Sequence, residues 1–114
     1  MDKYYDLYKS KIDYFVQNNK VMVFSKGYDP TCKYLKFLFS KKKFTDYKLV
    51  ELDEMKGGEI LDYALTKYCG KDTCPSVFID GKYIGGHQET WLMAGNGKLY
   101  TLLNKIGLKN HLFP

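Results

Sequence analysis

Residues 21–32 read VMVFSKGYDPTC, and this stretch decides the fold of the chain. Its first five residues, 21–25, form a short, mostly apolar run typical of a strand that is covered on both faces. Asp29 and Pro30 follow a turn, and this pair is typical of a helix N-cap with proline at the first helical position. Cys32 then falls in the first turn of that helix. The stretch has the layout of a redox site, because a helix N-terminus stabilises a thiolate.

Helices and strands alternate on both sides of this stretch. Hydrophobic periodicity and breaker residues predict helices over residues 3–18, 30–42, 57–70, 88–94 and 98–106, and strands over 21–25, 47–52, 76–79 and 82–84. Asp80-Gly81 predicts a two-residue hairpin turn between the last two strands. We expect one α/β domain over residues 1–114, with two parallel strands, an antiparallel hairpin and a loosely attached tail over 107–114.

The apolar positions of two helices predict which side chains enter the core. In the first helix these are Leu7, Ile12, Phe15 and Val16. In the third helix they are Ile60, Leu61, Ala64, Leu65 and Tyr68.

Composition excludes several classes of function. The chain has 114 residues and a formal net charge of +5, and all 18 basic residues are lysine. Arginine, whose planar fork suits phosphates and base edges, is absent, so we expect no nucleic-acid partner. No apolar run approaches the ~20 residues that span a bilayer, so we expect no membrane partner. The first residues contain no signal-peptide core, which favours an intracellular, cytoplasmic protein.

Four segments together resemble the glutaredoxin family. They are VFSKGYDPTC at 23–32, VELDEM at 50–55, TCPSVFI at 73–79 and GKYIGG at 81–86, and the likeness covers about residues 10–107. It implies a thioredoxin-like fold with a four-stranded mixed sheet flanked by helices. It also implies a glutathione-linked thiol–disulfide oxidoreductase, with glutathione as co-substrate and glutathionylated or disulfide-containing proteins as partners.

The same resemblance implies a glutathione-binding set. Lys26 matches the family lysine that pairs with the glycine carboxylate, and Glu89 stands where an aspartate usually holds the α-amino group. Pro75 is expected to be cis. The remaining members are Tyr28, Thr73, Cys74, Gly86, His87 and Gln88.

Two positions at the glycine-carboxylate end of this site differ from the family pattern. Leu61 occupies the position of a glutamine that contacts the glycine carboxylate, and Asp72 replaces a basic residue at the same end. Lys71, next to it, partly compensates. Lost contacts and added repulsion predict weakened glutathione binding.

Asp29 is the main departure from the family, because the attacking cysteine is expected at this position. A carboxylate cannot perform thiol–disulfide exchange, which proceeds through a thiolate. The residue instead makes a favourable helix cap. The scaffold of a redox site is therefore expected without its usual nucleophile.

Three cysteines remain, an odd number that argues against a structural disulfide framework. Cys32 matches the family's resolving cysteine and is the first candidate nucleophile, although the helix dipole and Asp29 shift its pKa in opposite directions. Cys74 replaces the valine before Pro75 and is the second candidate, or else a small buried hydrophobe. Cys69 is expected to be structural.

No metal site is expected. Asp29, Cys32, Cys74 and His87 could approach one another in this fold, but no local spacing of ligands supports zinc. Iron–sulfur binding, which some members of the family perform, uses the missing cysteine.

Two functions remain open. One is a glutathione-linked oxidoreductase that the D-P-T-C site leaves weakened or inactive. The alternative is a non-catalytic binding module that uses the former glutathione groove for a peptide or protein partner.

Overall fold

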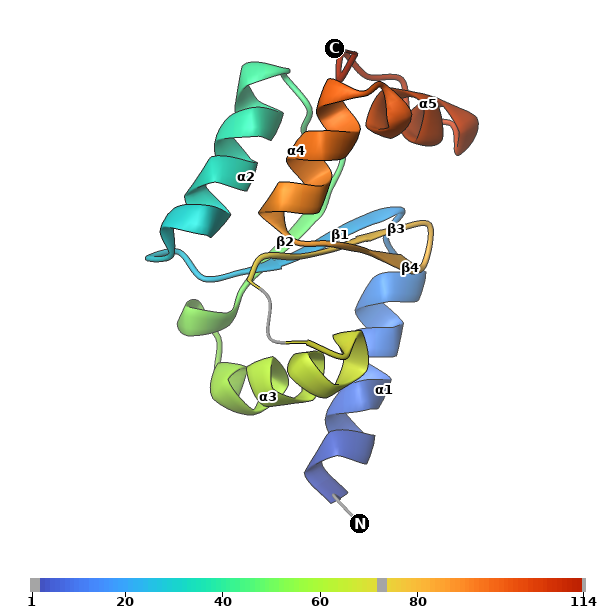
Figure 1. Cartoon of the computed structure of the whole chain (residues 1–114). Helices are drawn as coiled ribbons and strands as arrows, with labels where there is room; N and C mark the ends of the chain where they lie inside the picture. The colour runs from blue at the N-terminus through green and yellow to red at the C-terminus, as the bar shows by residue number, and fades with distance from the viewer. Residues whose placement is uncertain (1–2, 72–73, 114) are drawn as a thin grey trace.

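A four-stranded mixed sheet organises the molecule (Figure 1). The computed structural model describes residues 3–71 and 74–113. The strands β1 (Val21–Ser25), β2 (Lys48–Glu51), β3 (Ser76–Ile79) and β4 (Lys82–Gly85) lie in the order β2-β1-β3-β4. Strand β1 pairs with β2 in parallel and with β3 antiparallel, and β3 pairs antiparallel with β4. This is the sheet that the sequence predicts.

Helices cover both faces of the sheet. The helices are α1 (Lys3–Gln17), α2 (Pro30–Lys41), α3 (Gly58–Cys69), α4 (His87–Gly95) and α5 (Lys98–Lys105), and a short 3-10 turn, η1 (Leu52–Glu54), follows β2. In Figure 1, α1 and α3 lie on one side, and α2, α4 and α5 lie on the other. None of the described helices has the length and hydropathy that a membrane span requires.

Strand β1 supplies side chains to two cores, one on each face. Because successive side chains of a strand point to opposite faces, Val21 and Val23 pack toward α2 and α4, while Met22 and Phe24 pack toward α1 and α3. All five residues of β1 are buried. The strand that leads to Asp29 and Cys32 is therefore fixed from both sides.

Two backbone features define turns of the fold. Asp80 and Gly81 both have positive φ, 52° and 80°, as a tight two-residue hairpin turn requires. Gly58 starts α3 directly against η1, where a Cβ would overlap the carbonyl of Leu52. The glycine therefore lets α3 begin close to the end of β2.

Three sequence predictions about packing are wrong. Leu112 is fully buried in the core and Lys42 Nζ donates to the Phe113 carbonyl at 3.1 Å, so the tail is docked. Leu7 is 61% exposed, because it lies five residues, or about 140°, around α1 from buried Ile12. Ile60 is 38% exposed and lies at the edge of the α3 inner face.

Candidate active site

Asp29 caps helix α2, as the sequence predicts. Its Oδ1 accepts from the backbone N–H of Thr31 at 2.8 Å, and Pro30 occupies the first helical turn. The Thr31 hydroxyl lies 2.6 Å from the same oxygen and 2.7 Å from the carbonyl oxygen of Cys74. Since a hydroxyl carries one proton, it donates to one of these acceptors at a time. Thr31 thus ties the start of α2 to the loop that precedes β3.

Cys32 and Cys74 form a thiol pair. Their Sγ atoms lie 2.9 Å apart, although the residues are 42 positions apart in sequence. Cys32 is fully buried and its Sγ accepts from the backbone N–H of Lys26 at 3.4 Å. Cys74 is partly exposed, and the peptide bond between Cys74 and Pro75 is cis, as the resemblance implies.

The contact between the two thiols sets their acidity. The hydrogen bond from Cys74 is the main reason that the pKa of Cys32 is lowered to about 7, with help from the Lys26 backbone N–H. Burial and the Asp29 carboxylate act in the opposite direction. The same hydrogen bond, together with burial, raises the pKa of Cys74. The shared hydrogen bond therefore lowers the pKa of Cys32 and raises that of Cys74, which favours Cys32 as the thiolate of the pair.

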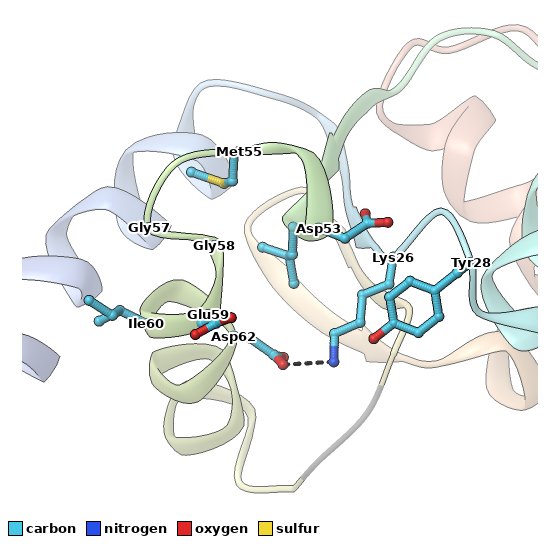
Figure 2. A pocket seen from close by; sticks show the side chains of 10 residues that line it. Lys26, Tyr28, Asp53, Met55, Gly57, Gly58, Glu59, Ile60 and Asp62 are labelled. Carbon is cyan, nitrogen blue, oxygen red and sulfur yellow. Dashed lines mark ion pairs between the residues drawn. The ribbon is translucent and has the colours of Figure 1, made fainter.

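A cavity of about 480 Å³ lies beside Lys26 and Tyr28. Figure 2 shows that Lys26 points across it toward α3, where its Nζ pairs with Asp62 at 2.7 Å. The hydrogen bond to Asp62 is the main cause of the raised pKa of Lys26. Asp53 and Glu59 also line the cavity. Lys26, which the resemblance assigns to the glycine carboxylate of glutathione, is thus paired with Asp62. The cavity forms a groove lined by three carboxylates, those of Asp53, Glu59 and Asp62.

Gly86 and Glu89 cap the N-terminus of helix α4. Glu89 Oε1 accepts from the Gly86 backbone N–H at 2.6 Å, so this carboxylate serves as a helix cap. Gly85, before it, has a φ of +136°, and a Cβ there would lie 2.6 Å from Glu89. His87 and Gln88 line a separate shallow hollow with Trp91 and Leu92.

Asp29, Cys32 and Cys74 converge more closely than any local spacing indicates. One ligand atom from each lies within 4.8 Å of the other two, and within the part of the chain that the structure describes His87 does not join them. Thr73, from the expected glutathione-binding set, and Asp72, expected to weaken that set, lie outside the described residues. Cys69 is half-buried, and burial raises its pKa to about 11. It therefore remains a thiol at neutral pH.

The glutaredoxin family model matches residues 21–84. The chain belongs to the glutaredoxin family. A glutaredoxin of Solanum lycopersicum is 43% identical over 98 residues, which cover 86% of this chain and 90% of that protein. An uncharacterized monothiol glutaredoxin of Caenorhabditis elegans is 42% identical over 97 residues, which cover 85% of this chain and 66% of that protein.

Solved structures of glutaredoxins show the same thioredoxin-like fold. A buckwheat glutaredoxin–glutathione complex superposes with a TM-score of 0.87 at 32% identity and covers 96% of this chain and 98% of that one. The holo form of glutaredoxin C1 from Populus tremula x tremuloides gives a TM-score of 0.85 at 32% identity, covering 96% and 99%.

The carboxylates that line the cavity beside Lys26, those of Asp53, Glu59 and Asp62, were missed from sequence. Leu61, expected at the position of a contacting glutamine, is fully buried in the core, and its neighbour Asp62 faces the groove instead. The signal was present, because Glu59 and Asp62 are three residues apart and share a face of α3. The pairing of Asp62 with Lys26 depends on a contact between distant segments and leaves no local pattern.

Proposed function

We propose that this glutaredoxin is a glutathione-linked thiol–disulfide oxidoreductase in which Cys32 and Cys74 perform the chemistry. The observation that carries the proposal is the 2.9 Å distance between their Sγ atoms. The usual first cysteine is replaced by Asp29, yet two thiols still meet at the start of α2. The buckwheat relative that was solved with glutathione supports glutathione as the co-substrate.

The reaction can be written with these residues alone and glutathione. The Cys32 thiolate attacks the glutathione sulfur of a mixed disulfide, forms a Cys32–glutathione disulfide and releases the substrate as a thiol. Cys74 then attacks the Cys32 sulfur, its proton passes to the departing glutathione, and a Cys32–Cys74 disulfide forms. Two molecules of glutathione reduce this disulfide and leave as oxidised glutathione. The proximity of Cys74 makes the second step intramolecular.

We further propose that activity is weak. Cys32 is fully buried, whereas the partly exposed position 29 holds a carboxylate that repels an anionic substrate. Lys26 is paired with Asp62, so glutathione must compete with this ion pair for the lysine. The carboxylates of Asp53 and Glu59 oppose the glycine carboxylate at the same end.

The test is reduction of a small glutathione mixed disulfide with glutathione and its reductase supplied. The wild type should be slow, Cys69→Ser should match it, and Cys32→Ser should be inert. Asp29→Cys should be faster than the wild type, because it restores a thiol at this partly exposed position. Full activity in a Cys32→Ser, Cys74→Ser double variant would exclude the proposed thiol pair.

A second candidate is a non-catalytic module that binds a peptide or protein partner in the groove. The Lys26–Asp62 ion pair favours it, because it occupies the residue that the resemblance assigns to glutathione. Titration with glutathione separates the two candidates. Saturable binding at millimolar concentration supports the oxidoreductase, and its absence supports the binding module.

Location remains a prediction. The sequence favours the cytoplasm, whereas two relatives carry the words mitochondrial and chloroplastic in their names, from Bos taurus and Oryza sativa subsp. japonica respectively. Fractionation of cells that express the tagged full chain would decide between these compartments.

A further inference from the structure

We propose that Asp29, Cys32 and Cys74 form a mononuclear binding site for a thiophilic divalent cation, Zn²⁺ in the first place. One carboxylate oxygen and two sulfur atoms lie within 4.8 Å of one another. They come from the start of α2 and from the cis-proline loop. The site shares its two thiols with the proposed redox reaction but does not depend on that reaction.

The donor set suits zinc. Cysteine sulfur and carboxylate oxygen bind Zn²⁺ at about 2.3 Å and about 2.0–2.2 Å, in tetrahedral geometry. This geometry places two sulfur ligands about 3.8 Å apart. The present Sγ distance of 2.9 Å must therefore open by about 1 Å. Such a change is small beside the side-chain rotation available to partly exposed Cys74.

Asp29 can bind a cation without giving up its role as a helix cap. The two contacts that it makes with Thr31, from the backbone N–H at 2.8 Å and from the hydroxyl at 2.6 Å, both fall on Oδ1. Its Oδ2 is then the ligand atom. Hydrogen bonds to the other carboxylate oxygen orient the group, which is the usual arrangement around a bound metal.

The surroundings also favour a metal–thiolate unit. Two thiolates, one carboxylate and a divalent cation carry a net charge of −1. The N-terminus of α2 and the Lys26 backbone N–H, 3.4 Å from Cys32 Sγ, stabilise this charge. Burial of Cys32 excludes water from one side, and the partial exposure of Asp29 and Cys74 leaves a fourth position for water or a small thiol.

Binding has a chemical consequence for the thiols. The cation displaces the remaining thiol protons to solvent, and both sulfurs become metal ligands. No electron is transferred, so the cysteines stay reduced. A bound cation and a Cys32–Cys74 disulfide are therefore mutually exclusive.

Cobalt titration tests the site. Reduced, full-length protein is titrated with Co²⁺ without oxygen, and the thiolate-to-cobalt charge-transfer absorption in the near ultraviolet is followed. The absorption should saturate at one equivalent and disappear when Zn²⁺ is added. Cys69→Ser, the matched cysteine control, should behave like the wild type. Asp29→Asn keeps the cap and should weaken binding by at least about tenfold.

Two outcomes overturn the proposal. One is the absence of charge-transfer absorption with excess Co²⁺, and the other is absorption that survives in a Cys32→Ser, Cys74→Ser double variant. Because these variants could fold poorly, wild-type protein alkylated after folding at partly exposed Cys74 serves as a second control and should not bind. A protein that reduces mixed disulfides without binding Co²⁺ refutes only this inference. One that binds Co²⁺ but is inert refutes only the proposed activity.

Discussion

Oxidation of Cys32 and Cys74 to a disulfide should raise the free energy of unfolding. The size of the gain depends on the number of residues between the two cysteines. We expect oxidised glutathione to convert Cys32 and Cys74 into a disulfide, because their Sγ atoms are already 2.9 Å apart. The two residues are 42 positions apart, and a loop of that length removes about 13 cal/mol/K of entropy from the unfolded chain. At room temperature this is about 4 kcal/mol, before any strain in the folded state is subtracted. The expected gain is thus about 2–4 kcal/mol.

The assay is urea unfolding of the oxidised and reduced forms, followed by circular dichroism. A Cys69→Ser background leaves Cys32 and Cys74 as the thiols, so one disulfide can form within a monomer. Free thiols are counted in denaturant before each experiment. Equal free energies of unfolding in the two forms, or two free thiols after oxidation, would refute the assigned pair.

Two further predictions concern charged contacts. Asp62→Asn should free Lys26 and tighten glutathione binding by up to about fivefold, since an ion pair near the protein surface is worth up to about 1 kcal/mol. Calorimetry would measure this, with Asp6→Asn on α1 as the control, and weaker binding would contradict the assigned groove. Tyr68→Phe removes the hydroxyl that donates to Asp13 Oδ1 at 2.6 Å and should lower stability by about 1 kcal/mol at neutral pH. This hydrogen bond is the main reason that the pKa of Asp13 is lowered, so its contribution is present above the unfolded pKa of about 3.9 and is lost as pH falls below it. Urea unfolding at neutral and acidic pH should show the difference between wild type and variant shrink in acid, and a constant difference would contradict this assignment.

The parts of the fold that follow from local chemistry could be predicted from sequence. The Asp80-Gly81 dipeptide determines a hairpin turn, and Asp29-Pro30 determines a helix start, since each depends only on adjacent residues. Docking of the tail could not be predicted in this way. Leu112 lies in a short irregular segment without periodicity, and its burial follows from contacts with distant residues.

The same distinction applies to the site. The positions of Cys32 and Cys74 followed from the family resemblance, but their 2.9 Å contact is a property of the assembled fold. The pKa of Cys32 shows why this matters. From sequence, the helix dipole and Asp29 opposed each other and left the sign open, whereas the hydrogen bond from Cys74 determines it in the structure.

The most direct test of the central claim is to map the sulfur atoms that react. Reduced wild-type protein and its Cys74→Ser variant are each treated with oxidised glutathione, and their peptides are analysed by mass spectrometry without reduction. The account predicts a peptide cross-linked between Cys32 and Cys74 in the wild type, and a lasting glutathione adduct on Cys32 in the variant. An adduct confined to Cys69, or two unmodified cysteines at positions 32 and 74, would contradict it.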